Sequence, residues 1–460
     1  MNLNKIIKPK SIAIIGISLS NPFNPANVIY HKNRHRYKAK TYCVNPKGGD
    51  IYGQQVYKSI SDIPEKIDTV VISIKSDFVP AILKECIQAE VSGAIIISGG
   101  FTESGKEDLQ NEIARIALEN DFPVIGPNCL GVFFPPFVDT FFLSSERLIQ
   151  IDEGSVSLIS QSGGILVDQL IKLTQEGVGV SKALSIGNKA VIDEVEMLKY
   201  LKQDKDTKVI GIYIEGFKPD RGRDFINEIN SAKKPVVLIK SGKTPGGNRA
   251  VSSHTASIAG DYFVFSEIVN NSAAIEAKSE TEFVSFCESL AAYPGARIKG
   301  IGIITASGGH GAMASDGCFS NGINVPEIPN KDKTILHDTL SPSIKSIASL
   351  ENPVDLTGSA VDNDFFSTTK FFMERDYIDA VMLLLLPYLP GLTSDIGARI
   401  AELTIIYKKP LLVYIPHVEK YGIFIEGFEI NGIPVAHSVE GAVYMAKAVT
   451  RRSENKTIRR

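Results

Sequence analysis

Short apolar runs alternate with longer amphipathic segments along the chain, and this alternation restricts the fold more than any other feature. The runs at 11–18, 69–74 and 93–101 are apolar throughout, without the period of two that marks a strand with one wet face. Between them, 78–91 and 105–120 carry apolar residues at three-to-four spacing, as amphipathic helices do. Strands that are apolar on both faces need a helical layer on each side. The pattern therefore predicts an open, doubly wound α/β sheet.

The same pattern restarts twice, which predicts three domains. Residues 144–154 are largely polar before strands return at 155, and Pro294 with Gly295 closes a helical segment before the next strand begins at 299. A chain of 460 residues is long enough for several domains. The expected α/β domains are 1–147, 148–294 and 295–460.

Charge and composition exclude several classes of protein. The 49 Lys and Arg residues against 52 Asp and Glu give a net charge of −3, which argues against a nucleic-acid partner. The longest apolar run, Ala380–Leu386, is far too short to span a membrane, and the amino terminus does not resemble a secretory signal. The five cysteines form no CxxC pair, which argues against disulfides and against a zinc or other metal site. These features favour a cytoplasmic protein without a membrane partner.

Glycines and small polar residues follow several of the predicted strands, where open α/β sheets bind ligands. Gly16 follows the first strand, but the next residues do not complete GxGxxG, so NAD is disfavoured. The turn fits either a phosphate-bearing nucleotide or a plain tight turn. Lys47, in Asn45-Pro46-Lys47-Gly48-Gly49, either offers its ammonium to a phosphate or is a solvated turn lysine.

Two further loops place small residues at the start of a predicted helix. Residues 160–164, SQSGG, resemble the nucleophile elbow GxSxG, but Ser160 replaces its first glycine, which weakens a hydrolase interpretation. Residues 307–311, SGGHG, have the same context. Such a helix start exposes unpaired N–H groups and the positive end of the helix dipole to an anion. Together they favour a phosphoryl group held between two domains.

One histidine differs from the others by its surroundings. His254 lies in the small, polar and glycine-rich stretch 246–257, which predicts a mobile loop. A neutral imidazole there becomes a nucleophile if an acceptor holds its Nδ1 proton. Glu215, at the end of the strand at 208–216, is the best placed acceptor, and its alternative is a strand-end carboxylate in water. The nearby Ser-Gly-Lys-Thr at 241–244 lacks the first glycine of a P-loop, which argues against nucleotide hydrolysis.

Six motifs in order give the chain a family resemblance: GPNCLG, SQSGG, SIGNKAVIDE, IYIEG, SSHTASIAG and NPVDLTG. With these, residues 8–447 resemble the α subunit of an ADP-forming acyl-CoA synthetase, in the superfamily of NDP-forming ligases that includes succinyl-CoA synthetase. The resemblance implies a Rossmann-like CoA-binding domain followed by two flavodoxin-like ligase domains.

The resemblance also implies a role for each candidate site residue. It implies that His254 is phosphorylated during turnover, that Glu215 supports it, and that Asn128 lies near the acyl group. The residues implied to line the coenzyme A site are Gly16, Ser18, Asn45, Lys47 and Glu103. The residues implied to bind phosphate at the two helix starts are Ser162, Gly163, Gly164, Ser307, Gly308, Gly309 and Gly311.

The implied reaction converts acyl-CoA, phosphate and ADP to a carboxylate, CoA and ATP through an acyl phosphate and a phosphohistidine. The acid would be acetate or another small acid. No part of the chain resembles an ATP-grasp fold, so ADP or ATP with Mg²⁺ is expected on a separate β subunit in an α2β2 heterotetramer. The alternatives are a non-catalytic protein of the same fold that binds or senses CoA, and a succinate-specific or citrate-cleaving ligase.

Overall fold

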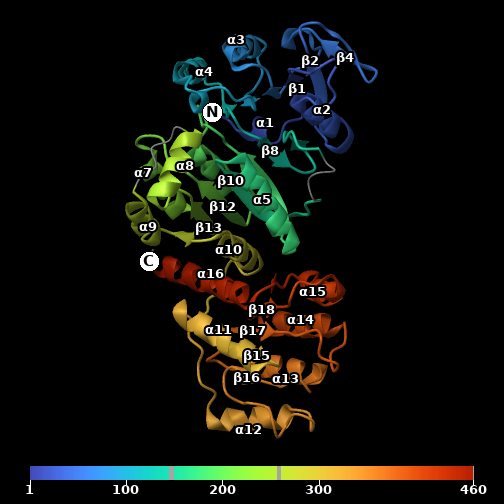
Figure 1. Ribbon diagram of the computed structural model, residues 1–460, viewed down its shortest axis with the longest axis vertical. Coiled ribbons are helices and arrows are strands. Elements are labelled where there is room, and N and C mark those ends of the chain that lie inside the picture. The colour runs from blue at the N-terminus through green and yellow to red at the C-terminus, as the bar shows by residue number, and fades with distance from the viewer. Residues whose placement is uncertain (145–149, 256–260, 459–460) are drawn as a thin grey trace. The chain divides into compact units, whose positions relative to one another are not determined.

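Apolar runs of the amino-terminal region form the parallel strands of a seven-stranded sheet, as the sequence predicts. The computed structural model describes residues 1–144, 150–255 and 261–458. All five residues of the first strand are buried, and it pairs in parallel with a neighbour on each side. The strand order is β3-β4-β2-β1-β5-β6-β7, with β3 and β4 antiparallel to each other. Figure 1 draws β1, β2 and β4 of this sheet in the blue, amino-terminal part of the chain. The strands are β1 (Ser11–Ile15), β2 (Lys40–Val44), β3 (Gly49–Ile51), β4 (Gln54–Tyr57), β5 (Thr69–Ile72), β6 (Ala94–Ile96) and β7 (Val124–Ile125).

Amphipathic helices accompany this sheet, and local capping starts one of them. Asn24 accepts a hydrogen bond from the Ala26 N–H (2.9 Å), and Pro25 occupies the first turn, where its missing N–H is harmless. The helices are α1 (Asn4–Ile7), α2 (Pro25–Arg36), α3 (Val79–Gln88) and α4 (Glu107–Glu119), with short 3₁₀ turns η1 (Ile60–Asp62), η2 (Ser76–Phe78) and η3 (Thr102–Ser104).

A second seven-stranded sheet follows, in the order β14-β13-β12-β10-β11-β8-β9. Its central strands are parallel and entirely or largely buried. The strands are β8 (Gly131–Phe134), β9 (Val138–Asp139), β10 (Glu153–Ser160), β11 (Val180–Ser185), β12 (Val209–Ile214), β13 (Val236–Lys240) and β14 (Ala274–Ala277). The helices are α5 (Gly163–Gln175), α6 (Glu194–Gln203), α7 (Arg221–Ser231), α8 (Pro245–Thr255) and α9 (Tyr262–Asn270).

The hairpin of β8 and β9 joins the two sheets and was missed by the sequence analysis. It follows the last strand of the first sheet, yet β8 pairs antiparallel with β11 of the second. Lys32 on α2 holds it from the other side, with its Nζ 2.7 Å from Asp139 Oδ2, and both side chains are almost fully buried. Burial lowers the pKa of Lys32 and raises that of Asp139, and their contact opposes both shifts. By residue contacts, both sheets belong to one unit, Met1–Thr174 with Gly179–Glu276.

The second unit, Gln175–Val178 with Ala277–Arg460, contains a five-stranded parallel sheet with its own apolar core. The strand order is β16-β15-β17-β18-β19. The strands are β15 (Ile301–Thr305), β16 (Val354–Asp355), β17 (Ala380–Leu384), β18 (Leu411–Tyr414) and β19 (Val435–Ala436). The helices are α10 (Glu280–Ala292), α11 (Gly308–Ser320), α12 (Asn330–Thr339), α13 (Asp362–Met373), α14 (Ile396–Tyr407), α15 (Gly422–Glu429) and α16 (Val439–Ile458), with the 3₁₀ turn η4 (Glu419–Tyr421).

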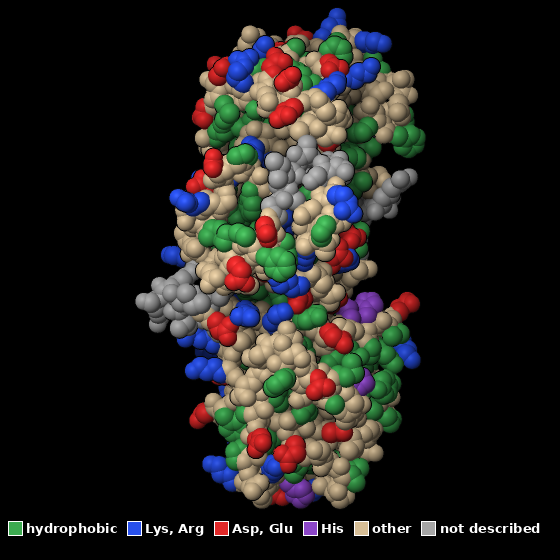
Figure 2. Space-filling model, turned by 60° about the vertical axis from the view of Figure 1, so that its left-hand side comes forward, with side chains coloured by type: hydrophobic (Ala, Val, Ile, Leu, Met, Phe, Trp, Pro, Cys, Tyr) green, Lys and Arg blue, Asp and Glu red, His purple; other side chains and the backbone are tan. Residues whose placement is uncertain are grey.

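The predicted α/β fold class is confirmed, because the strands of all three sheets are mostly parallel and alternate with helices. By contacts, α10 groups with the second unit, although the predicted boundary at 294 lies after it. Lys, Arg, Asp and Glu side chains are intermixed over the face in Figure 2. None of the described helices has the length and apolar character needed to cross a membrane.

A buried carboxyl group in the second unit makes its stability depend on pH. Glu288 on α10 accepts the Val435 N–H through Oε1 (2.9 Å), whereas Oε2 has no hydrogen-bond partner among the residues that the structure describes. Burial, together with the charges of Glu176 and Glu429, raises the pKa of Glu288 well above its usual range. A raised carboxyl pKa favours the fold while the group is protonated. This contribution is complete below the ordinary pKa of Glu, about 4.3, and is lost as the pH rises through the folded value.

We therefore expect Glu288→Gln to stabilise the second unit at high pH. The amide keeps an acceptor for the Val435 N–H and cannot ionise. Amide hydrogen exchange at Val435, measured on the whole chain, should slow several-fold relative to wild type at pH 8, with a smaller change at pH 5. An equal effect at both pH values would contradict a role for ionisation of Glu288.

Candidate active site

The turn after β1 has a backbone that only glycine accommodates. Gly16 has a φ of +105°, and a Cβ atom there would lie 2.0 Å from the carbonyl oxygen of Ser73. Its N–H donates to the carbonyl of Val44 (3.2 Å). The turn therefore lies close to the carboxyl ends of the neighbouring strands, where open α/β sheets bind ligands.

The loop after β2 is tied to this turn by a side-chain amide. Asn45 Nδ2 donates to the carbonyl of Ile17 (2.6 Å), and its Oδ1 accepts the N–H of Lys47 (2.9 Å). Ser18 Oγ accepts the N–H of Asn21 (3.0 Å). Asn45 and Ser18 therefore shape the two loops. The Lys47 side chain is exposed and forms no ion pair with the described residues, so its ammonium is available to an anion.

Glu103 is engaged by the protein itself. Its Oε1 accepts the N–H groups of Gly100 (2.5 Å) and Phe101 (3.2 Å), and its Oε2 accepts Asn188 Nδ2 (2.6 Å). Burial opposes ionisation, but the bonds from Asn188 and from the backbone outweigh it and lower the pKa of Glu103. Glu103 is thus an ionised anchor between the loop after β6 and the loop after β11.

A cavity of about 450 Å³ brings together two of the predicted sites within the first unit. It joins the GPNCLG loop, which carries Asn128, to the amino-terminal turn of α5, which carries Ser162, Gly163 and Gly164. The full lining is Ile97, Asn128, Cys129, Leu130, Phe142, Leu143, Gln161, Ser162, Gly163, Gly164, Val167, Gly187 and Asn188. None of these side chains is that of an acidic or basic residue.

Two tight turns hold Asn128 at this cavity. Asn128 has a φ of +58°, and its Nδ2 donates to Asn188 Oδ1 (3.4 Å). Gly187 also has a positive φ, and a Cβ atom there would lie 2.3 Å from the carbonyl oxygen of Pro127. The close approach of these turns requires glycine at 187. Asn188 therefore links Glu103 to Asn128, and so links the first sheet to the cavity.

The start of α5 opens into the cavity. N–H groups in the first turn of a helix have no acceptor within the helix, and the dipole makes this end positive. A Cβ atom at Gly164 would meet nothing within 4 Å, whereas one at Gly163 would lie 2.9 Å from Leu130 Cγ. The backbone at Gly164 is therefore open to a ligand, and the described lining carries no carboxylate that competes with an anion.

Glu215 is buried at the end of β12, with only 5% of its surface exposed. Tyr213 Oη lies 3.3 Å from Glu215 Oε1, and Lys240 Nζ donates to the Glu215 carbonyl (2.8 Å). The alternative interpretation, a strand-end carboxylate in water, is wrong, because the residue is buried.

His254 belongs to a helix, where the sequence analysis predicted a mobile loop. Thr244 Oγ1 accepts the N–H of Gly247 (3.1 Å), and Pro245 begins α8. A Thr cap followed by Pro starts a helix, and this signal outweighs the glycines after it. The helix α8 contacts η3, which carries Glu103. The side chain of His254 and residues 256–260 lie outside the described residues.

The SGGHG segment starts a helix in the second unit, as predicted, with a carboxylate beside it. Ser307 precedes α11, and its Oγ lies 3.0 Å from His310 Nδ1. A Cβ atom at Gly308 would lie 3.2 Å from Asp355 Oδ2, so this carboxylate already faces the positive end of the helix. Gly309 and Gly311 lie in the same turn. The two helix starts therefore differ in the charge beside them.

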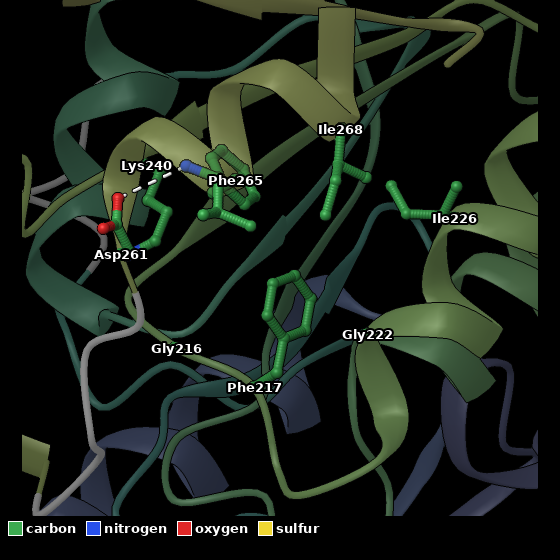
Figure 3. Close-up of a pocket in the computed structure, with 9 residues that line it drawn as sticks. Gly216, Phe217, Gly222, Ile226, Lys240, Asp261, Phe265 and Ile268 are labelled. Carbon is green, nitrogen blue, oxygen red and sulfur yellow. Dashed lines mark hydrogen bonds between the residues drawn. The ribbon is translucent and has the colours of Figure 1, made fainter. Parts of the chain in front are cut away.

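A second cavity of about 270 Å³ lies in the first unit, and its lining is mainly apolar. Figure 3 shows the side chains of Phe217, Ile226 and Ile268 converging on one space, with Lys240 and Asp261 beside it. Lys240 Nζ donates hydrogen bonds to the carbonyl oxygens of Glu215 and Ser241, both at 2.8 Å. This cavity is therefore not built for a phosphate.

Several residues of the larger cavity were not predicted from the sequence. Gln161 lies inside the SQSGG motif, and Asn188 lies in SIGNKAVIDE, so their position after a strand was the available signal. The apolar wall of Phe142, Leu143 and Val167 had no such signal, because nothing in the sequence shows which segments meet. Among the described residues, no group of three or more His, Cys, Asp or Glu side chains is arranged to hold a metal ion.

Three family models match the chain in the order of its sheets. A CoA binding domain matches residues 10–135, a succinyl-CoA ligase like flavodoxin domain matches residues 153–290, and a Ligase-CoA domain matches residues 301–395. The expected order of a CoA-binding domain and two ligase domains is therefore confirmed.

Relatives with known names support the same assignment. Acetate–CoA ligase [ADP-forming] I subunit alpha of Pyrococcus furiosus is 32% identical over 98% of this chain and 97% of its own length. Acetate–CoA ligase [ADP-forming] of Methanocaldococcus jannaschii is 36% identical over 78% of this chain, but the match covers only 49% of that protein. The chain thus spans about half the length of the Methanocaldococcus protein.

A solved structure agrees over nearly the whole chain. It is the dinucleotide forming acetyl-coenzyme A synthetase 1 of Ca. Korarchaeum cryptofilum in complex with phosphate and ADP, 29% identical, with a TM-score of 0.90 over 99% of this chain and 98% of that chain. The order of the motifs, the three matching domains and the full-length α-subunit relative agree. The chain belongs to the family of ADP-forming acetate–CoA ligases.

Proposed function

We propose that the chain is the α subunit of an ADP-forming acyl-CoA synthetase that converts acyl-CoA, phosphate and ADP to a carboxylate, CoA and ATP. The observation that carries the proposal is the cavity in which the GPNCLG loop and the open start of α5 meet. It offers an amide to an acyl oxygen and helix N–H groups to a phosphate in one space. The P. furiosus relative is named as an α subunit, and the Ca. Korarchaeum structure contains phosphate and ADP.

Coenzyme A would bind at the loops after β1 and β2. The Gly16 turn brings the backbone close to a ligand, and Asn45 and Ser18 hold the two loops in shape. Lys47 supplies an exposed cation with no ion-pair partner among the described residues, which suits a phosphate of CoA. Glu103 would act indirectly, because its carboxylate is used by Gly100 and Asn188.

In the first step, a phosphate oxygen would attack the thioester carbonyl. The new C–O bond forms as the C–S bond breaks, and the thiolate of CoA leaves. Asn128 would hold the acyl oxygen, and the N–H groups at the start of α5 would stabilise the phosphoryl oxygens. In the second step, the imidazole of His254 would take the phosphoryl group and release the carboxylate, with Glu215 supporting the ring that becomes cationic.

The lining of the cavity favours an acid with one carboxylate. An acyl group there would meet the apolar wall of Phe142, Leu143 and Val167. A second carboxylate, as in succinate, would meet no Lys or Arg side chain among the described lining residues, and an unpaired buried charge is costly. We therefore favour acetate or another small monocarboxylic acid over a succinate-specific ligase.

A partner would complete the reaction. The proposal places ADP or ATP with Mg²⁺ on an ATP-grasp β subunit, in an α2β2 heterotetramer in the cytoplasm. The start of α11, with Ser307, Gly308, Gly309 and Gly311, remains a second candidate phosphate site, although Asp355 beside it weakens its attraction for anions. Among the described lining residues, the proposed site on α5 has no such opposing charge.

The covalent step predicts the behaviour of a His254→Asn variant. Incubation of the purified chain with an acyl-CoA and labelled phosphate should place acid-labile phosphate on wild-type His254. The variant should carry none, because its amide is not a nucleophile, and it should still bind CoA. Mass spectrometry of the modified peptide measures the first result, and calorimetry with CoA measures the second.

The same experiment separates the proposal from the non-catalytic alternative. A chain that only binds or senses CoA would bind CoA normally and acquire no phosphate in the wild type. Phosphate on another residue, or equal labelling of the His254→Asn variant, would overturn the assignment of His254.

Lys47 predicts a salt-dependent contribution to CoA affinity. Lys47→Ala should weaken CoA binding several-fold at low salt, and the difference should shrink as salt rises, because an exposed ion pair is screened over about 10 Å at 0.1 M salt. Titration of CoA at 0.02 M and 0.5 M salt measures both effects, and Lys84→Ala, which removes an exposed lysine of α3, is the control. Equal CoA affinity of wild type and Lys47→Ala at low salt would show that Lys47 is a solvated turn lysine without a contact to CoA.

The apolar lining predicts the choice of acid. The value of kcat/KM for acetyl-CoA or another monoacyl-CoA should exceed that for succinyl-CoA by about 100-fold or more, because the second carboxylate of succinate would lose its hydration without a cation to pair with. Release of CoA in the presence of phosphate gives this ratio. Comparable values for the two thioesters would contradict the proposed orientation of the acyl group.

A further inference from the structure

Gln161 lies between β10 and α5, directly before the proposed phosphate site. Its side chain lines the larger cavity, yet only 4% of the residue's surface is exposed. Its own N–H donates to the carbonyl of Tyr213 (3.3 Å), which fixes the backbone beside β12. A polar side chain that is this deeply buried needs hydrogen-bond partners for both ends of its amide.

The two ends of this amide are distinguished by their surroundings. Gln161 Oε1 accepts the backbone N–H groups of Glu215 (2.9 Å) and Gly216 (3.3 Å). A backbone N–H only donates, so the oxygen must face these two groups and the NH₂ group must occupy the other position. Nε2 forms no hydrogen bond with any residue that the structure describes. The amide therefore keeps two N–H donors for a ligand of the cavity.

These donors complement the start of α5. The helix has thirteen residues, and its first turn supplies the N–H groups of Gly163 and Gly164. The side-chain amide of Gln161 adds a donor from two residues before this turn, in a cavity whose described lining has no acidic residue. We propose that Gln161 Nε2 donates a hydrogen bond to the phosphate, and then to the phosphoryl group of the acyl phosphate, at the start of α5. This inference rests on the proposed function.

The same amide also connects the phosphate to Glu215. Its oxygen holds the Glu215 and Gly216 N–H groups, while Lys240 Nζ donates to the Glu215 carbonyl (2.8 Å) and Lys189 Nζ donates to the Gly216 carbonyl (2.7 Å). The peptide groups after β12 are thus held on both sides. The two lysine contacts remain when Gln161 is changed, so this segment keeps part of its support in a variant.

Two substitutions separate a phosphate donor from a structural clamp. Gln161→Glu keeps an oxygen for the Glu215 and Gly216 N–H groups but replaces the donor with a negative oxygen. Gln161→Met is neutral and removes both the acceptor and the donor. A phosphate donor predicts that affinity for phosphate falls in the order wild type, Met, Glu, because the carboxylate repels the ligand. A clamp alone predicts that Glu resembles wild type and that Met is the weaker binder.

The measurement is calorimetric titration of the purified full chain with inorganic phosphate. We expect about 10-fold weaker binding for Gln161→Met and about 100-fold or weaker binding for Gln161→Glu, as the loss of a hydrogen bond to a charged group and added repulsion imply. Gln203→Glu, an exposed residue at the end of α6, adds the same charge and should bind phosphate like wild type. Thermal unfolding of each variant shows whether the fold is retained.

The outcomes distinguish this inference from the proposed function. Wild-type chain that neither binds phosphate nor becomes phosphorylated would overturn the proposed function and this inference together. Wild-type binding with unchanged affinity in Gln161→Glu would overturn only the role of Gln161. If Gln161→Glu unfolds at a lower temperature, the neutral Met variant decides, because its affinity for phosphate should still fall in a chain that remains folded at the temperature of the titration.

Discussion

The buried contact between Lys32 and Asp139 holds the arrangement on which the proposed site depends. It ties α2 of the first sheet to the hairpin that pairs with the second sheet. Breaking such a pair by removing one partner leaves a buried charge without compensation, which typically costs about 3–5 kcal/mol. The hairpin begins two residues after Cys129, so its position also sets the position of the GPNCLG loop. The cavity exists because this loop is held against the start of α5.

Around the cavity, several polar side chains already form hydrogen bonds within the protein, which limits the groups that remain for a ligand. The Glu103 carboxylate accepts hydrogen bonds from two backbone N–H groups and from Asn188, and Asn188 in turn contacts Asn128. Gln161 uses its oxygen on the backbone after β12. The donors that remain for a ligand of the cavity are the N–H groups at the helix start and the amide of Gln161. A surface of donors with no acidic residue among its described lining is suited to phosphate.

The predictions from sequence succeeded where one residue type has one physical use. Gly16 was identified because it follows a strand, and its positive φ and close contact with Ser73 explain why no other residue fits. The glycines around His254 predicted a loop, which was wrong for residues 245–255, because Thr244 and Pro245 start the helix α8 there. The placement of Glu103 beside CoA stays a prediction, and its hydrogen bonds show that it anchors neighbouring loops. The sequence could not show that Asn188, which lies 85 residues away, donates a hydrogen bond to the Glu103 carboxylate.

The sequence by itself determined the alternation of strands and helices, the family, and the helix starts at SQSGG and SGGHG, because each depends on residues that are neighbours in the chain. Only the tertiary structure decided which of those features share a site. Residues 131–139 join the second sheet although they follow the first, and Asp355 lies at the start of α11 although it is far along the chain. Hydrogen bonds and charges act over a few ångströms of space. The pairing of distant segments therefore decided that the start of α5 faces a cavity whose described lining residues carry no charge and that the start of α11 faces a carboxylate.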